Sequence, residues 1–161
     1  AKPPIWVANR MPPTESADKL TVPHGFIEAA TPVPGVGVLF ARTRGGETAL
    51  GFAVTQAHCA ASGALLPALQ AAFAAQVGEN FVRDLAAPQP PPVLVSLTSA
   101  FIAQASEGQW VEGAARLIRR TRSLVFAAVE VRAGGRTMMT AEGVWQSVPD
   151  AAAAIMEDGR G

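Results

Sequence analysis

The hydrophobic pattern of the chain changes along its length and predicts one unusual helix. Residues 63–79 read GALLPALQAAFAAQVGE, and alanine and leucine favour helix. Large apolar residues recur there every four positions, the spacing of one helix face: Leu65, Leu69, Phe73 and Val77. The other faces are mostly alanine, and the only polar residues are Gln70, Gln76 and Glu79. Such a helix must be covered on nearly all sides. Its regular part should begin near Leu66, because Pro67 is tolerated in a first turn.

Runs rich in strand-forming residues lie on both sides of this helix. Residues 37–43 and 47–55 are separated by Arg44-Gly45-Gly46, and glycine tolerates the positive φ of a tight hairpin turn. After the helix, four further runs look like strands: residues 93–105, 109–120, 124–132 and 136–148. The order of hairpin, buried helix and four-stranded meander predicts an α+β fold in which an antiparallel sheet curls around one long helix.

The ends of the chain differ from its middle. Residues 1–35 are rich in proline, so regular structure there can only be short. We therefore divide the chain into a proline-rich N-terminal segment (1–35), a folded domain (36–148) and a tail (149–161). Residues 15–20 and 151–156 are candidates for short helices at the two ends.

Charge and composition exclude several classes of function. The 161 residues suit one domain, and 13 basic residues balance 13 acidic ones, which gives no reason to expect nucleic acid or a membrane surface as partner. No apolar run reaches the roughly 18 to 20 residues of a membrane span, and no secretory signal is visible, so we expect a cytoplasmic protein. Two histidines and the single Cys59 lack metal-ligand spacing, so we predict no metal and no cofactor. His58 and Cys59 are neighbours that a strand would point to opposite faces, so they predict no nucleophile and base pair.

Three stretches carry a resemblance to a known family, and they cover residues 25–42, 50–76 and 95–145. The third is the most specific. It contains the sequence GQWVEG from Gly108, the loop Thr121-Arg122-Ser123 and the sequence AEGVW from Ala141. In these stretches the chain resembles hotdog-fold acyl-CoA thioesterases related to phenylacetyl-CoA and 4-hydroxybenzoyl-CoA thioesterases. The resemblance implies the hotdog fold, with the long helix wrapped by the sheet.

The chain departs from the polar residues of that family. In the family a His-Gly-Gly turn opens the helix, and an acidic residue follows nine positions after the His. When Leu66-Pro67-Ala68 is placed on that turn, Ala75 falls on the acid. Ala60 then falls on an expected Asn, and Leu94 falls near an expected hydroxyl. Each expected polar group is thus replaced by an apolar one.

Thioester hydrolysis needs a polarised carbonyl and an attacking water or carboxylate. The resemblance assigns the first task to a backbone N–H at the helix start, where the helix dipole favours negative charge. Pro67 has no N–H, so Ala68 is the predicted donor. For the second task, Glu79 lies one turn beyond Ala75 on the same face, and Gln76 could orient water. The alternative for Glu79 is a solvated residue at a helix end.

Several residues are candidates for binding the substrate. Ser96 and Thr98 are expected to share a face with Leu94 and to supply a hydroxyl. Arginine forks suit the phosphates of coenzyme A, and the resemblance implies that the loop Thr121-Arg122-Ser123 borders the CoA cleft. The alternative is a solvated strand edge. The predicted substrate-binding set is Ala60, Leu66, Ala75, Leu94, Ser96, Arg120, Thr121, Arg122 and Ser123.

Two functions remain open at this point. The first is hydrolysis of an acyl-CoA thioester with an atypical active site. The second is a non-catalytic hotdog module that binds acyl-CoA or another apolar ligand, which the apolar replacements favour. The resemblance also implies a homodimer or a dimer of dimers, with sheets joined edge to edge and sites at the interface. Residues 124–132 are one candidate for an exposed edge strand.

Overall fold

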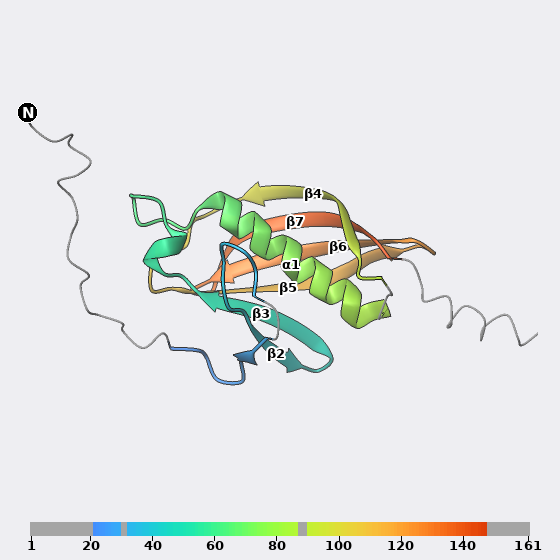
Figure 1. The fold of residues 1–161 in the computed structure, drawn as a ribbon, viewed down its shortest axis with the longest axis horizontal. Coiled ribbons are helices and arrows are strands. Elements are labelled where there is room, and N and C mark those ends of the chain that lie inside the picture. Colours follow the sequence, from blue (N-terminus) through green and yellow to red (C-terminus); the bar gives the residue numbers. More distant parts are fainter. Residues whose placement is uncertain (1–20, 30–31, 87–89, 148–161) are drawn as a thin grey trace, which may run out of the picture.

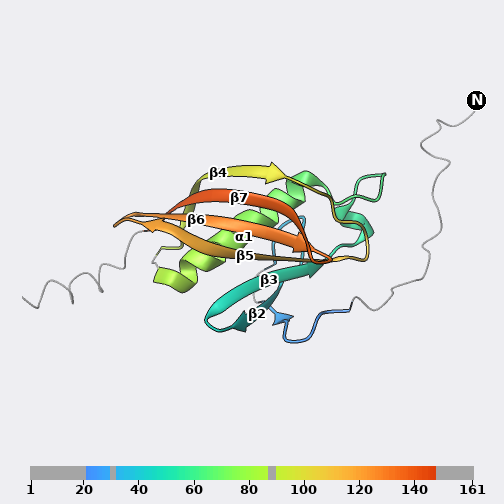
Figure 2. The ribbon, with the colours of Figure 1, turned by 180° about the vertical axis from the view of Figure 1, so that it is seen from behind.

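The computed structural model describes residues 21–29, 32–86 and 90–147. In these residues a long helix lies across one face of a seven-stranded antiparallel sheet (Figures 1 and 2). The short helices predicted over residues 15–20 and 151–156 lie outside the described residues. The elements in chain order are β1 (Ile27–Glu28), β2 (Phe40–Arg44), β3 (Glu47–Ala53), the 3-10 helix η2 (Gln56–His58), α1 (Pro67–Ala86), β4 (Val93–Phe101), β5 (Trp110–Arg120), β6 (Leu124–Ala133) and β7 (Arg136–Gln146).

Helix α1 begins at Pro67, close to the predicted start, but it continues to Ala86, beyond the predicted end at Glu79. Glycine weakens a helix interior, so Gly78 looks like a stop in sequence. In the structure a Cβ at Gly78 would lie 2.1 Å from the ring of Trp145, which is fully buried. The glycine is therefore a packing requirement, and the helix runs through it.

The strand order is β1-β2-β3-β5-β6-β7-β4, which confirms the predicted hairpin β2–β3 and corrects the rest. Strands β5, β6 and β7 form a meander, but β4 pairs with β7 at the far edge while β5 pairs with β3. The predicted four-stranded meander is therefore wrong for its first strand. Residues 124–132, predicted as an edge candidate, lie in β6, an interior strand between β5 and β7. Strand patterns reveal which residues form strands, but the choice of partner depends on packing over α1.

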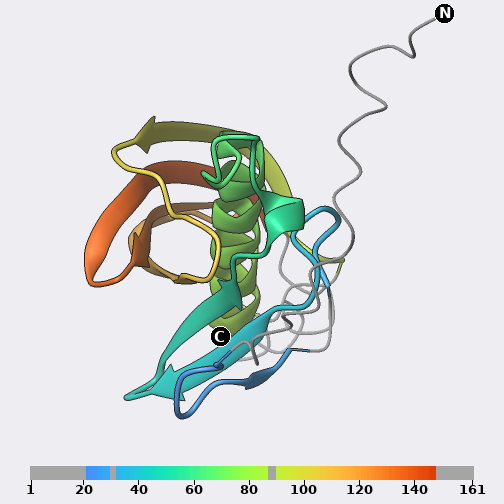
Figure 3. The same ribbon diagram turned by 90° about the vertical axis from the view of Figure 1, so that its left-hand side faces the viewer.

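The core lies between α1 and the inner face of the sheet. Figure 3 shows the fold from one side, with the strands curving around the helix. The helix buries a stripe that includes Phe73, Ala74, Val77 and Val82. The sheet covers this stripe with the inward residues of its central strands, such as Val111, Val129, Val131 and Met139. The predicted hotdog architecture is thereby confirmed. Within the described residues, neither helix combines the length and the apolar character that crossing a membrane needs.

Candidate active site at the start of helix α1

The segment that leads into α1 is held by backbone hydrogen bonds from two directions. The N–H of Leu66 donates to the carbonyl of His58 at 3.0 Å, and the N–H of Leu65 donates to the carbonyl of Ala105 at 2.8 Å. The first partner follows β3 and the second follows β4. The start of the helix is therefore fixed between two separate parts of the chain, as a preorganised site requires.

The first turn of α1 presents one free donor. The carbonyl of Leu66 accepts from the N–H groups of Leu69 (3.0 Å) and Gln70 (3.1 Å), which makes Leu66 the N-cap. Pro67 has no N–H. The N–H of Ala68 has no hydrogen bond to any described residue, and Ala68 is exposed. A free donor at the positive end of a helix favours developing negative charge. The catalytic role of Ala68 stays a prediction, but the donor it needs is present.

Gln70 is a polar residue in an apolar place. Its side chain is 1% exposed, and its Nε2 amide has no hydrogen-bond partner among the described residues. Long helical side chains lean back toward the preceding turn, so the amide extends toward the start of α1. A buried donor without a partner costs about 1–3 kcal/mol. The sequence alone shows Gln70 only as a polar residue in a predicted helix. The missed signal was its spacing, three residues before Phe73 on the stripe that faces the core.

The turn before α1 offers a second starting point for counting the nine positions to the family's acidic residue. Ala61, Ser62 and Gly63 lie at this turn, and Gly63 has a positive φ of 81°. The predicted match for the His-Gly-Gly turn, Leu66-Pro67-Ala68, already forms the N-cap and first residues of the helix. If the family's turn corresponds to residues 61–63, the ninth position after its first residue is Gln70. Gln70 is thus the ninth residue after Ala61, whereas Ala75 is the ninth after Leu66.

Glu79 and Gln76 lie far from the free donor within one chain. Glu79 is eleven residues beyond Ala68, which is about 16 Å along a helix that rises about 1.5 Å per residue. Its Oε1 accepts a hydrogen bond from Arg83 at 2.5 Å. Gln76 is about 12 Å from Ala68 by the same rise. Of the predicted site, the structure brings together Ala60, Leu66 and Ala68, because Ala60 and Leu66 lie in the anchored segment before Ala68.

His58 is occupied by structural hydrogen bonds. Its Nδ1 accepts from the N–H of Thr55 at 3.0 Å, so its Nε2 carries the proton and donates to the carbonyl of Val36 at 2.7 Å. Neither ring nitrogen is left to act as a base, which agrees with the predicted structural role. Cys59 is half-buried, and its Sγ contacts the Thr55 carbonyl at 3.4 Å. No group of three potential metal ligands occurs among the described residues.

Strand β4 contains an irregularity that corrects one prediction. Leu94 pairs with Trp145 of β7, but Ser96 pairs with the next residue, Val144, because an extra residue lies between them. Trp145 and Val144 point to opposite faces of the sheet. Leu94 therefore lies on the α1 side, while Ser96 and Thr98 lie on the outer side. The expectation that the three residues share a face is wrong, because a bulge changes the alternation and sequence gives no sign of it here.

The loop that includes Arg120, Thr121, Arg122 and Ser123, called the 120–123 loop below, lies at the other end of the sheet. Arg120 is the last residue of β5, the other three follow it, and all four are exposed. The next residue, Leu124, pairs with Gln146, and Gln146 pairs with Val93 at the start of β4. The start of α1 instead adjoins Ala105, beyond the end of β4. Within one chain, the predicted CoA-binding loop and the free donor are thus at opposite ends.

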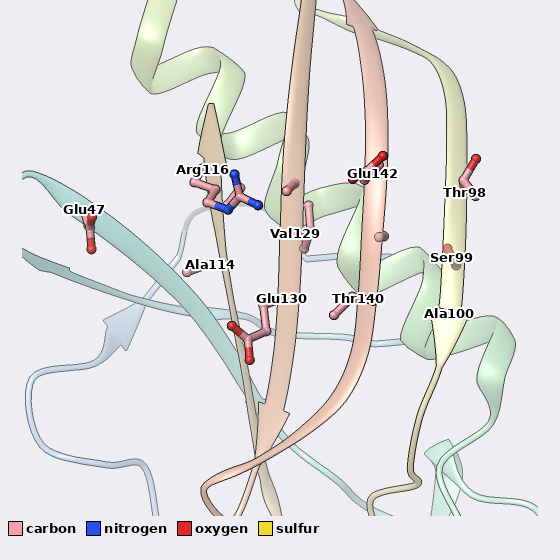
Figure 4. A pocket seen from close by; sticks show the side chains of 13 residues that line it. Glu47, Thr98, Ser99, Ala100, Ala114, Arg116, Val129, Glu130, Thr140 and Glu142 are labelled. Atoms are coloured by element: carbon pink, nitrogen blue, oxygen red, sulfur yellow. The ribbon is translucent and has the colours of Figure 1, made fainter. Parts of the chain in front are cut away.

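A hollow of about 580 Å³ lies on the outer face of the sheet (Figure 4). Arg116, Ala128 and Glu142 occupy one row across β5, β6 and β7, with Ala128 between the two charged residues. Glu130 also lines the hollow, and its Oε1 accepts from Thr137 at 2.6 Å. No residue of α1 lines it. The hollow is open, lies across the sheet from the helix, and contains no part of the free-donor site.

Comparison with known proteins identifies the family. The sequence profile of the thioesterase superfamily matches residues 47–140, so the chain belongs to the thioesterase superfamily. Its fold is the hotdog fold of that superfamily. No significant match is found among curated proteins.

Solved structures share this fold at low sequence identity. A hypothetical thioesterase from Streptococcus pneumoniae TIGR4, determined with coenzyme A, has a TM-score of 0.63 and 11% identity, over 70% of this chain and 90% of that one. A phenylacetic acid degradation-related protein from Ralstonia eutropha JMP134 has a TM-score of 0.59 and 20% identity, over 76% and 84%. The PaaI protein of E. coli has a TM-score of 0.62 and 11% identity, over 68% and 79%.

Proposed function

We propose that this protein binds acyl-CoA thioesters at the start of α1 and hydrolyses them slowly, with an active site that lacks a carboxylate base. Superfamily membership supports the thioester as the substrate class. The observation that carries the proposal is the unpartnered N–H of Ala68 at the positive end of an anchored helix. Such a donor fits the negative charge that forms on the thioester oxygen during attack.

The reaction can proceed from this donor and water. A hydroxide ion, formed from a solvent water molecule, attacks the thioester carbon, the carbon–sulfur bond breaks, and the products are a carboxylic acid and the CoA thiol. The proton lost by the water reaches the leaving sulfur through solvent. A donor of this kind is worth about 10²–10³ in rate. The missing general base costs about 10²–10⁴, so we expect slow turnover.

A second copy of the chain would complete the site. Strand β4 is an edge of the sheet, and an apolar edge strand is suited to pairing with another strand. Large apolar residues along β4 and just after it are 40–59% exposed: Val93, Leu94, Val95, Phe101 and Ile102. Antiparallel pairing of two β4 strands would join the two sheets into one and cover these residues. This pairing is the edge-to-edge homodimer that the family resemblance implies, and a dimer of dimers would need a further interface.

The same pairing explains how distant predicted residues can act together. In an antiparallel β4 pair, the Val93 end of one strand lies beside the Phe101 end of the other. The 120–123 loop adjoins Val93 through Leu124 and Gln146. The 120–123 loop of one subunit would therefore approach the start of α1 in its partner. Arginines that bind the CoA phosphates would then lie in the same site as the Ala68 donor.

A second function is binding without hydrolysis. It is favoured by the absence of a carboxylate from the first turn of α1 and by the hydrogen bonds that occupy both nitrogens of His58. In this case the protein would hold an acyl-CoA and release it unchanged. The two functions share the same site and differ only in whether water attacks the bound thioester.

Thiol release from acetyl-CoA, hexanoyl-CoA and phenylacetyl-CoA distinguishes these functions. The proposal predicts turnover above the buffer blank that rises about tenfold per pH unit without a plateau, because no protein base is being ionised. A plateau that Glu79→Ala abolishes would instead make Glu79 the base. Binding by calorimetry without turnover would establish the second function, and neither binding nor turnover would reject both.

A further inference from the structure

The amide of Gln70 has no role in the mechanism above, although it is the most unusual polar group near the site. It is buried to 1% exposure in the first turn of α1, and its Nε2 has no partner among the described residues. Buried donors in folded proteins are nearly always paired, so an unpaired one needs an explanation. Among the described residues, two other buried donors also lack a partner: the indole N–H groups of Trp110 and Trp145. These indoles pack against glycines away from the helix start.

The surroundings of Gln70 specify what could pair with it. Its stripe continues through Phe73, Ala74 and Val77, which offer no side-chain acceptor. The ring of His58, in the segment that precedes α1, donates from Nε2 to Val36 and accepts at Nδ1 from Thr55. No described residue pairs with this amide, and an acceptor group carried by a ligand would satisfy it. The amide leans back toward the first turn, where the free N–H of Ala68 also needs an acceptor.

We propose that the Nε2 of Gln70 and the N–H of Ala68 together bind the carbonyl oxygen of the acyl-CoA. This inference rests on the proposed function and adds a second donor and a basis for specificity. A neutral amide can donate to the oxygen in both the ground state and the transition state. It cannot accept a proton from water, so the same residue explains strong carbonyl recognition and slow hydrolysis. The site should therefore select ligands that carry a carbonyl at the thioester position.

A matched pair of stable ligands tests this selection. S-hexyl-CoA lacks the carbonyl, whereas the ketone analogue of hexanoyl-CoA, with CH₂ in place of sulfur, keeps it. We expect the wild-type protein to bind the ketone about tenfold more tightly, measured by calorimetry. Gln70→Met keeps the length of the side chain but removes the donor. It should lose about threefold to tenfold of this preference and leave the affinity for S-hexyl-CoA unchanged.

Two further variants make the result decisive. Gln146→Met is a matched control at an exposed position at the end of β7, and it should keep the full preference. Gln70→Glu keeps the side-chain size, loses the donor when ionised, and places a base beside the carbonyl. It should lose the preference and hydrolyse hexanoyl-CoA at least tenfold faster than the wild-type protein.

An unchanged preference in a folded Gln70 variant would overturn the inference. So would an equal loss of affinity for both ligands, because that result describes a structural role only. The failure of the proposed function looks different, since the wild-type protein would then bind neither CoA ligand.

Discussion

The two halves of α1 differ in how well their groups are satisfied. In the second half, Gly78 lies directly against the buried ring of Trp145, and there is no room for even a Cβ. In the first turn, Ala68 has a free N–H and Gln70 has a buried amide without a partner. The second half is closely packed, whereas the first turn has two donors that no described residue satisfies. Proteins commonly violate packing and pairing rules where they function.

The largest effect on stability should come from adding a side chain in the closely packed second half of α1. Gly78→Ala would place a Cβ 2.1 Å from the Trp145 ring. Overpacking costs about 1–3 kcal/mol and occasionally more, and alanine returns up to about 1 kcal/mol of helix propensity. We expect the free energy of unfolding in urea to fall by about 2 kcal/mol. Adding Trp145→Phe should recover part of the loss contributed by Gly78→Ala. If the two losses simply add, the ring contact does not explain the glycine.

The next effect concerns the edge that should join two copies. Val95→Lys places a charge on the exposed edge strand β4, where Val95 is 59% exposed. It should weaken the dimer by more than tenfold and lower acyl-CoA hydrolysis, because each site needs the partner's 120–123 loop. Analytical ultracentrifugation measures the dimer. Val38→Lys, at a position 48% exposed outside β4, should leave it intact. A fully active Val95→Lys monomer would contradict the shared site.

A smaller effect should separate stability from function at the first turn. Leu66 is a poor N-cap residue, and aspartate is a good one, worth about 1 kcal/mol. Leu66→Asp should raise the free energy of unfolding by about this amount, because its carboxylate can accept from the Ala68 N–H. The same contact occupies the catalytic donor, so hydrolysis should fall at least tenfold. Leu66→Ala, which cannot cap, should show no gain in stability. A gain in stability with full activity would remove Ala68 from the mechanism.

The smallest effect should come from the 120–123 loop. Arg120 and Arg122 are exposed, so each phosphate contact is screened by solvent. The double variant Arg120→Ala and Arg122→Ala should weaken binding of CoA about threefold to tenfold in low salt, with a smaller difference in high salt. Arg44→Ala, on an exposed residue of β2, serves as the control. Equal affinities at low salt would place the phosphates elsewhere.

The sequence was sufficient to predict the fold because the signals were local and strong. The alanine-rich composition predicted α1, Pro67 marked its start, and Gly45-Gly46 marked the first hairpin. The position of β4 was not predictable, because any strand with a similar pattern could have paired with β3. The extension of α1 past Gly78 was also hidden, since it depends on Trp145, which is distant in sequence.

The candidate site was predicted only in part. Ala68 followed from the helix start and from the missing N–H of Pro67, and the structure leaves that donor free. Gln70 was overlooked because its burial and its unpaired amide are properties of packing. The predicted face of Ser96 is wrong because a bulge between Leu94 and Ser96 changes the alternation of β4. The distance between Ala68 and the 120–123 loop could not be anticipated either, since the sequence does not show which end of the sheet each occupies.

A crystal structure of the protein with the ketone analogue of hexanoyl-CoA tests the central claim most directly. We predict that the carbonyl oxygen lies within hydrogen-bond distance, about 2.7–3.2 Å, of both the Ala68 nitrogen and the Gln70 Nε2, with the phosphates near the partner subunit's Arg120. A ligand bound on the outer face of the sheet, or a carbonyl oxygen that contacts neither donor, would contradict the account.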